Sequence, residues 1–233
     1  MLDLDRLDRV LIIAPHADDE LIGCGGLMSR LTASSAEVRV LYMAVDGFHH
    51  YGIDGETTYQ QRIAEIDLVK SEFGFTYTIA YGDKDLIEQL DTLPKRDLVD
   101  RFEHAFDGFR PQLLLLPSGK DYDQDHVATF ETAFAAARPM PQSIGKWLIP
   151  HVFVYEMSKL MWSVDAISRP VAYLDISADL ERKLQGISLY RSQLRDSPHI
   201  RSLESVTALA SLRGKEIGVE HAEAYGVLRT VLT

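Results

Sequence analysis

The chain has little cysteine and lacks long runs of basic or of apolar residues. Cys24 is the only cysteine among 233 residues, so no disulfide can form within the chain, which fits a reducing compartment. Because no Lys/Arg block appears and the formal net charge is -11, binding to nucleic acid or to an anionic membrane surface is disfavoured. No apolar run is long enough to span a bilayer, and residues 1–9 lack a signal-peptide core. We therefore expect a soluble, cytoplasmic protein.

Hydrophobic residues are plentiful and evenly spread along the chain. They make up 46% of the sequence, which is enough for a large core. No internal repeat, low-complexity tract or convincing linker divides the chain. We therefore expect a single domain over residues 1–233.

Short apolar runs alternate with segments of helical periodicity. The expected strands cover residues 9–14, 38–45, 77–81, 112–117, 151–155 and 171–176. The expected helices cover residues 24–34, 58–73, 97–109, 126–137, 179–195 and 202–229, the last with a break near Gly214. This alternation predicts an α/β fold of Rossmann-like build, with a mostly parallel sheet and helices on both faces.

A polar corner follows the first expected strand. His16, Asp18, Asp19 and Glu20 lie within five positions, just after Pro15. Adjacent carboxylates repel each other and lose solvation when buried, so a divalent cation would stabilise the group. The alternative is structural, because an aspartate here could cap the next helix and Glu20 would suit its first turn.

A second polar loop, residues 118–126, follows the expected strand at 112–117. In an open parallel sheet, the loops after the strands emerge at one edge, where ligands bind. Two histidines, His16 and His126, and several carboxylates can therefore converge although over a hundred residues separate them. Two imidazoles and a carboxylate, with further positions open to water, are typical of catalytic zinc.

The sequence resembles a known family at this point. Residues 14–26, Ala-Pro-His-Ala-Asp-Asp-Glu-Leu-Ile-Gly-Cys-Gly-Gly, resemble the signature of the PIG-L/LmbE-like N-acetylglucosamine deacetylases, which is His-Pro-Asp-Asp-Glu before a glycine-rich helix start. The second motif of that family, His-Pro-Asp-His, resembles residues 123–126, Asp-Gln-Asp-His. Three further stretches match the family in residue type and in their order along the chain. They are Asp46-Gly47, Arg62 with Glu65, and residues 213–223.

The resemblance implies a zinc-dependent hydrolase that removes the acetyl group from an N-acetylglucosamine-type amino sugar or its conjugate. His16, Asp19 and His126 would be the metal ligands, and Asp18 would be the general base that activates the metal-bound water. Zn²⁺ is the expected cofactor, and another divalent ion such as Fe²⁺ is compatible. The expected partner is a small amino-sugar substrate, without nucleic acid or stable membrane insertion, and a homo-oligomer is compatible with the sequence.

Asp123 departs from the second motif of the family. It stands where the family has a histidine that is thought to stabilise the oxyanion or to serve as an acid, and an ionised carboxylate would repel an oxyanion. Either Asp123 is protonated, or it orients another group, or another residue supplies the donor. The candidates for that donor are Tyr122, His151 and His221. Ala17 also replaces the usual proline, which loosens the turn and leaves the chemical groups in place.

Arg62, Asp46 and Asp123 are the candidates for substrate binding. Arg62 would contact substrate hydroxyls or phosphate, as the resemblance implies, or would form a surface ion pair with Glu65. Asp46 could hydrogen-bond a ligand histidine or could simply form a turn. Glu223 is expected to hold the C-terminal helix in place.

Two other classes of function are alternatives. The departure at Asp123 fits a catalytically silent, metal-containing relative that binds carbohydrate. Gly23, Gly25 and Gly26 after a strand also allow a Rossmann enzyme that binds a nucleotide or S-adenosylmethionine. The carboxylates at residues 18–20 disfavour this last alternative, because they would repel a pyrophosphate.

Overall fold

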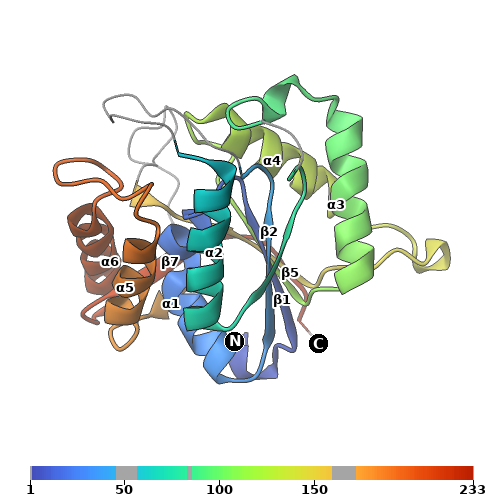
Figure 1. Ribbon diagram of the computed structural model, residues 1–233. Helices are drawn as coiled ribbons and strands as arrows, with labels where there is room; N and C mark the ends of the chain where they lie inside the picture. The colour runs from blue at the N-terminus through green and yellow to red at the C-terminus, as the bar shows by residue number, and fades with distance from the viewer. Residues whose placement is uncertain (1, 46–56, 83–85, 159–171, 233) are drawn as a thin grey trace.

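A seven-stranded sheet forms the centre of the protein (Figure 1). The computed structural model describes residues 2–45, 57–82, 86–158 and 172–232. The strands lie in the order β3-β2-β1-β4-β5-β7-β6. Their bounds are β1 Arg9–Ala14, β2 Glu37–Tyr42, β3 Thr76–Ile79, β4 Leu113–Leu116, β5 His151–Tyr155, β6 Ala172–Asp175 and β7 Ala222–Thr230. Strands β1 to β5 pair in parallel, and β7 runs antiparallel to both of its neighbours.

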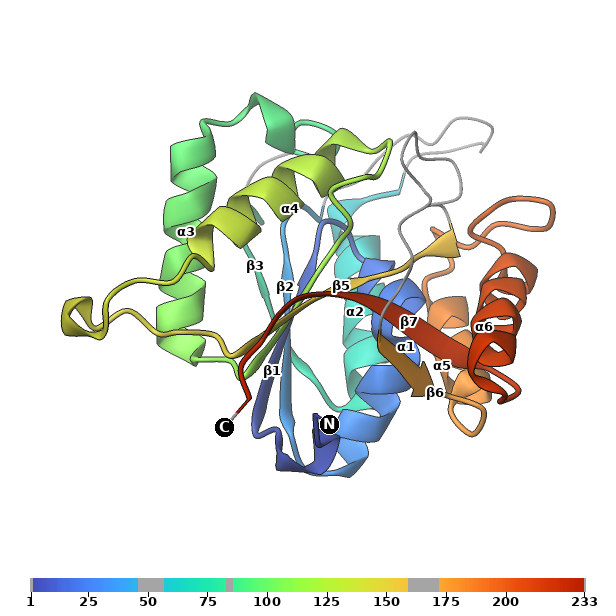
Figure 2. The ribbon, with the colours of Figure 1, turned by 180° about the vertical axis from the view of Figure 1, so that it is seen from behind.

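Helices cover both faces of this sheet (Figures 1 and 2). One face carries α1, α2, α5 and α6, and the other carries α3 and α4. The helix bounds are α1 Asp19–Ala33, α2 Tyr59–Phe73, α3 Lys95–Phe109, α4 Gln124–Ala136, α5 Leu180–Leu189 and α6 Leu203–Ile217, with short 3-10 helices at Leu4–Arg6, Leu90–Thr92 and Gln142–Ile144. The predicted α/β fold with a mostly parallel sheet is therefore confirmed.

The central strands are apolar along their whole length because both of their faces are covered. In β1, Val10 and Ile12 enter the core beneath α1 and α2, whereas Leu11 and Ile13 enter the core beneath α3 and α4. All four leucines of β4 are buried, and they alternate between the same two cores. These unbroken apolar runs are the feature that made β1 and β4 easy to predict.

The order of the strands reverses at β1. From β1 the chain builds β2 and β3 on one side, and it then returns to place β4 on the other side. The loops after β1 and β4 therefore emerge side by side at the carboxyl edge of the sheet, which is the switch point where α/β proteins bind ligands. Both polar stretches singled out in the sequence lie in these two loops and in the first turns of the helices that follow them, α1 and α4.

The predicted start of the first helix is wrong. The helix was expected from residue 24, but α1 begins at Asp19, so residues 19–23 also belong to it and Gly23 lies inside it together with Gly25 and Gly26. A Cβ atom on Gly23 would lie 2.3 Å from Tyr155 Cδ2, and one on Gly26 would lie 2.4 Å from Ile176 Cγ2. These glycines allow close packing of α1, which counts against their use in a nucleotide-binding loop.

The predicted helix over residues 202–229 is also wrong in its second half. Helix α6 ends at Ile217, where Gly218 adopts a left-handed conformation with φ 79°. Strand β7 then inserts between β5 and β6. The first four residues of β7, 222–225, are all buried, including Glu223, so burial there does not follow the alternation of polar and apolar residues. The helix expected over residues 179–195 is shorter as well and ends at Leu189.

Glu223 on β7 is fully engaged with helix α1. Its carboxylate accepts hydrogen bonds from the backbone N–H groups of Gly26 and Leu27, at 2.8 and 2.9 Å. It also accepts from Lys183 Nζ of α5 and from Tyr225 Oη, each at 2.7 Å. Glu223 was expected to hold a C-terminal helix, but the element that it holds is α1.

Among the described residues, none of the helices combines the length and the apolar character needed to cross a membrane. The cytoplasmic location stays a prediction.

Candidate metal centre and active site

The candidate site is built from the two turns at the switch point. His16 and Asp18 lie in the turn after β1, and Asp19 is the first residue of α1. Asp123 is the N-cap of α4, where its Oδ1 accepts a hydrogen bond from Asp125 N at 3.0 Å. This cap starts α4 early enough to place His126 in its first turn, facing the β1 turn.

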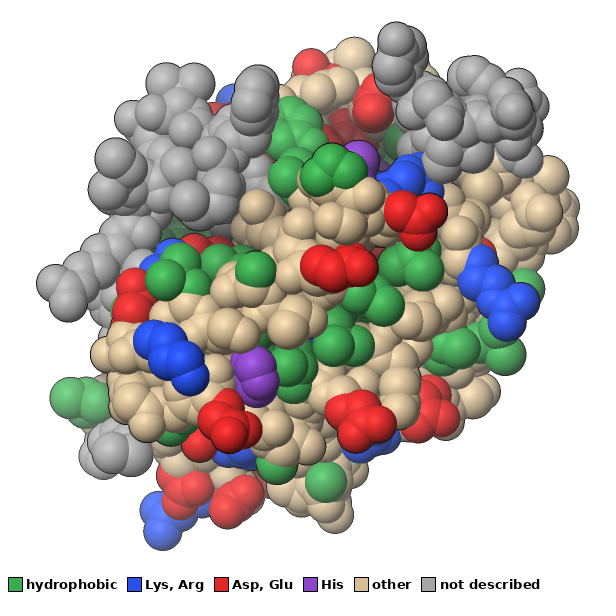
Figure 3. All heavy atoms as spheres, turned by 90° about the vertical axis from the view of Figure 1, so that its left-hand side faces the viewer, with side chains coloured by type: hydrophobic (Ala, Val, Ile, Leu, Met, Phe, Trp, Pro, Cys, Tyr) green, Lys and Arg blue, Asp and Glu red, His purple; other side chains and the backbone are tan. Residues whose placement is uncertain are grey.

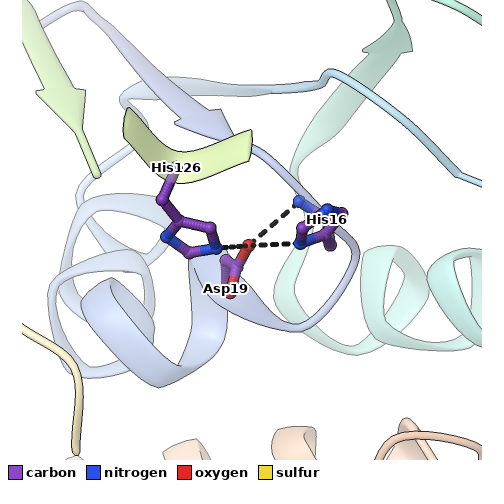
Figure 4. A group of neighbouring side chains, drawn as sticks. All are labelled: His16, Asp19 and His126. Carbon is purple, nitrogen blue, oxygen red and sulfur yellow. Dashed lines mark hydrogen bonds and ion pairs between the residues drawn. The ribbon is translucent and has the colours of Figure 1, made fainter. Parts of the chain in front are cut away.

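Three side chains converge on one point (Figure 4). Asp19 Oδ2 accepts a hydrogen bond from the backbone N–H of His16 at 2.9 Å and lies 3.6 Å from His16 Nδ1. The same oxygen lies 3.1 Å from His126 Nε2. One nitrogen of each histidine and one oxygen of Asp19 all lie within 4.8 Å of one another, which is the spacing of a candidate metal site.

A second carboxylate faces the far side of each histidine ring. Asp121 Oδ2 lies 3.1 Å from His126 Nδ1, and Asp125 Oδ2 lies 2.9 Å from His16 Nε2. A carboxylate favours the tautomer that carries a proton on the nitrogen it faces. This arrangement leaves Nε2 of His126 and Nδ1 of His16 as the ligating nitrogens, and both of them point toward Asp19.

The donor set fits a divalent transition metal. Two neutral imidazoles and one carboxylate, with no thiolate, suit zinc or iron and leave coordination positions for water or substrate. His126 is fully buried, Asp19 is 3% exposed, and His16 is only partly buried, so the site opens on the side of His16.

Asp125 has a further structural role that sequence reasoning missed. Its two carboxylate oxygens accept hydrogen bonds from the backbone N–H groups of Glu88 and Leu90, at 2.7 and 2.8 Å. The segment before α3 is thereby fastened to the start of α4, beside His16. Only the run of alternate aspartates at 121, 123 and 125 could have signalled these roles in the sequence.

Asp18 lies next to the cluster in an unusual backbone conformation. Its φ is 115°, in the left-handed region, and it is the N-cap of α1 without a side-chain capping bond. Its backbone N–H donates instead to Glu20 Oε2 at 3.1 Å. Glu20 is completely buried, and its Oε1 accepts a hydrogen bond from Tyr190 Oη at 2.6 Å. Burial raises the pKa of Glu20 to about 8.

The candidates for substrate binding lie in different surroundings. Asp123 Oδ2 is 3.8 Å from His126 Nε2, so Asp123 borders the metal cluster. Arg62 is 2% exposed and donates to the carbonyl of Ala17 at 3.0 Å and to Ser192 Oγ at 3.4 Å, so it is not the surface ion pair considered from the sequence. Glu65 accepts from Ser192. Asp46 lies outside the described residues.

The three residues considered as donors in place of the family histidine lie in different parts of the structure. Tyr122 is half exposed beside Asp123. His151 begins β5 and so lies at the amino edge of the sheet, away from the cluster. His221 lies ahead of β7, where its ring is 3.1 Å from Ser211 Oγ of α6. Only Tyr122 is near the candidate site.

Arg201 is a residue of the site that the sequence did not reveal. Its guanidinium nitrogen NH1 lies 3.8 Å from Asp18 Oδ2, although the two residues are far apart in the chain. In Figure 3 the surface is hollowed near the top, with acidic side chains inside the hollow and a histidine and basic side chains beside it. No motif marks Arg201, because only the fold brings it to Asp18.

The fold and the site define an α/β protein with a candidate divalent-metal site at the switch point of its sheet. The PIG-L family model, described as GlcNAc-PI de-N-acetylase, matches residues 11–137, more than half of the chain. The chain belongs to the PIG-L family. The predicted family is thus confirmed, and with it the predicted class of enzyme, a hydrolytic N-deacetylase.

Solved structures share the fold over almost the entire chain. The conserved protein TT1542 from Thermus thermophilus is 22% identical, with a TM-score of 0.74, and the match covers 97% of both chains. N,N'-diacetylchitobiose deacetylase from Pyrococcus horikoshii is 21% identical, with a TM-score of 0.73, covering 97% of this chain and 85% of that chain. GalB, the 4-carboxy-2-hydroxymuconate hydratase from Pseudomonas putida, is 20% identical, with a TM-score of 0.74. The match covers 97% of this chain and 98% of that chain. Because these sequence identities are low, the matches show that the fold is shared and nothing more.

Proposed function

We propose that the protein is a metal-dependent deacetylase that removes the acetyl group from an N-acetylglucosamine-type amino sugar or its conjugate. The observation that carries this proposal is the convergence of His16, Asp19 and His126 beside the carboxylate of Asp18. Membership of the PIG-L family supports the same reaction class. The fold shared with a chitobiose deacetylase is consistent with an amino sugar as substrate.

We propose Zn²⁺ as the metal, held by His126 Nε2, His16 Nδ1 and Asp19, with Fe²⁺ as the alternative. A bound divalent ion would polarise the amide carbonyl and lower the pKa of a water molecule toward neutrality. Asp121 and Asp125 would keep the two imidazoles in the ligating tautomers.

In this proposal Asp18 is the general base and then the general acid. Its carboxylate takes a proton from the attacking water, whose oxygen forms a bond to the amide carbon while the carbonyl electron pair moves onto oxygen. The C–N bond then breaks, and Asp18 returns the proton to the departing amine. The products are acetate and the protonated amine, once the remaining acid proton has moved to the amine.

We also propose that residues 1–233 form one domain. Strands from the first and last parts of the chain lie in one continuous sheet, with β7 next to β5. Glu223 on β7 further ties that strand to α1.

The test is an acetate-release assay on a panel of free and conjugated N-acetyl amino sugars, coupled to metal analysis of the same sample. We expect acetate release that a chelator abolishes and that added Zn²⁺ or Fe²⁺ restores. Turnover that survives complete removal of metal would contradict the proposal.

The departure at Asp123 favours a second candidate, a metal-containing relative that binds carbohydrate without turnover. Bound metal together with saturable sugar binding, but with no acetate from any member of the panel, would support this candidate over the deacetylase.

A further inference from the structure

Arg201 places a positive charge over the acidic side of the candidate site. Its side chain is 28% exposed, and its NH1 lies 3.8 Å from Asp18 Oδ2. Burial alone would lower the pKa of Arg201, but the nearby charges of Asp18, Asp19 and Asp123 and the Tyr122 side chain raise it overall. The guanidinium thus faces the carboxylates that line the site and is protonated at any working pH.

The backbone around Arg201 is firmly held. Arg201 N–H donates to His199 Nδ1 at 3.1 Å, and the carbonyl of Ile200 accepts from Ser158 Oγ. The next residue, Ser202, is the N-cap of α6, and its Oγ accepts from Ser205 N at 3.2 Å. A donor carried on such a fixed segment is preorganised, which is what stabilisation of a developing charge requires.

Asp123 cannot provide that stabilisation. Its Oδ1 is committed to capping α4, and a carboxylate at a helix N-terminus is favoured in its ionised form. Its Oδ2 lies 3.8 Å from His126 Nε2, where it adds negative charge beside the cluster. A positive side chain near Asp123 would offset this negative charge and add to the stabilisation that a bound metal would give to an amide oxygen.

We propose that Arg201 is a catalytic residue that donates to the amide oxygen of the substrate, in place of the histidine that the family motif has where Asp123 stands. This inference rests on the proposed deacetylase function. When water attacks the amide carbon, the carbonyl electron pair moves onto oxygen, and the guanidinium stabilises that charge. When the C–N bond breaks, the pair returns to the carbonyl, and the amine leaves with the proton from Asp18.

Arg195 is a matched control for Arg201. It is a neighbouring arginine, but its guanidinium donates to the backbone carbonyls of Ser192 and Leu194, at 3.1 and 2.8 Å. Loss of Arg195 therefore removes a positive charge of the same kind near the site without removing the contact with Asp18.

The experiment compares Arg201→Ala, Arg201→Lys and Arg195→Ala in the metal-loaded protein. We expect Arg201→Ala to lower kcat by about 100- to 1,000-fold with little change in KM, as for loss of an oxyanion donor. Arg201→Lys should recover part of the loss, because it keeps the charge, and added guanidinium ion should partly rescue Arg201→Ala. Arg195→Ala should stay within about threefold of the parent protein, because it makes no contact with the reacting atoms.

A double-mutant cycle with Asp123→Asn tests why the cation is needed. Asparagine caps a helix as well as aspartate does, so α4 should keep its start. Because the negative charge is gone, the cost of Arg201→Ala should shrink at least several-fold in this background. An unchanged cost would contradict the proposed compensation of Asp123 by Arg201.

Other outcomes would overturn the inference. A rise in KM at constant kcat would make Arg201 a binding residue for an anionic part of the substrate, and a loss of metal in Arg201→Ala would make it a positioning residue for the cluster. If the parent protein releases no acetate from any substrate, the proposed function itself fails. Calorimetric binding of acetate to the metal-loaded protein then tests Arg201 separately, and equal affinity in Arg201→Ala would contradict its role in binding the acyl oxygen.

Discussion

Asp18 combines a chemically useful side chain with an unfavourable backbone. A φ of 115° in a residue other than glycine costs on the order of 1–3 kcal/mol and persists only where the surroundings enforce it. The turn after β1 is held by the hydrogen bond from Arg62 to the carbonyl of Ala17 and by that from Asp18 N to Glu20. Aspartate and asparagine tolerate this region better than most residues, so the identity of the side chain can be tested without much added strain.

The first prediction concerns Asp18→Asn. We expect turnover to fall by about 100- to 10,000-fold, because the variant keeps the shape of the side chain but cannot accept the proton. Metal content and thermal stability should stay close to those of the parent protein. Asp97→Asn, an exposed change on α3, is the control and should leave kcat/KM unchanged. A fully active Asp18→Asn would disprove the assignment of the base.

The second prediction concerns Asp121→Asn. Asp121 faces His126 Nδ1 and is 9% exposed, so its loss removes the group that favours the ligating tautomer. We expect the affinity for the metal to fall by about 10- to 100-fold, measured by competition with a chelator of known affinity. If the affinity stays within about twofold of the parent value, Asp121 does not orient His126.

At the scale of elements, helix α1 is packed too closely to accept side chains at its glycines. Gly25 and Gly26 face Lys183 and Ile176, and Gly23 faces the ring of Tyr155, whose hydroxyl donates to the carbonyl of Ile13 in β1. A change at these positions would push α1 away from the sheet and would move Asp19 with it.

The third prediction compares two alanine substitutions in helices. Gly23→Ala places a Cβ atom 2.3 Å from Tyr155 Cδ2 and should destabilise the protein by about 1–3 kcal/mol. Gly108→Ala in α3 meets nothing within 4 Å and should stabilise it by about 0.5–1 kcal/mol, because alanine is the better helix former. Denaturant unfolding of both variants checks the prediction, and equal effects would show that close packing is not the reason for Gly23.

The elements that the sequence predicted well are those in which pattern and burial agree. Strands β1 and β5 have the predicted bounds, and α2 differs by one residue, helped by Gly74 at its C-cap with φ 76°. Strand β7 was missed because alanine and glutamate, which favour helices, fill its first three positions directly after helix α6. The start of α1 was placed too late because the polar run at residues 16–20 and Gly23 resemble a loop until the packing of Gly23 against Tyr155 is known.

For the whole molecule, the candidate metal site links two separate parts of the sheet. His16 and Asp19 follow β1, whereas His126 lies on α4 after β4, so an ion held by all three joins both parts at the switch point. Binding to the folded state alone adds stability by mass action.

The fourth prediction concerns metal addition to metal-free protein. At a concentration of about 100 times its Kd, the ion should raise the free energy of unfolding by about 2.7 kcal/mol. For a chain of this size, that raises Tm by roughly 5–10 °C. His126→Ala should lose this gain, whereas His104→Ala, an exposed change on α3, should retain it. Thermal unfolding with and without a chelator is the measurement, and an equal gain in His126→Ala would place the metal elsewhere.

Parallel topology predicted from the sequence that two histidines and several carboxylates meet at one edge of the sheet, and the family resemblance selected His16, Asp19 and His126 among them. It could not predict the roles of Asp121, Asp125 or Arg201. The partners of Asp125 and Arg201 lie in distant segments, and which carboxylate faces which imidazole depends on side-chain positions that only the fold determines. Arg62 shows the same limit, because it is buried and its hydrogen bond to the carbonyl of Ala17 supports the turn after β1, which the sequence did not reveal.

The hydrogen bonds from α1 to Glu223 also have a consequence for the order in which the protein matures during synthesis. All three candidate metal ligands are synthesised by the time residue 126 is reached, but the carboxylate that accepts hydrogen bonds from the middle of α1 follows close to a hundred residues later. Until β7 inserts between β5 and β6, the helix that begins with Asp19 lacks the acceptor for these bonds. The nascent chain therefore carries all three candidate ligands before it carries the carboxylate that accepts these bonds, and we expect the insertion of β7 to be needed before α1 is fully fixed.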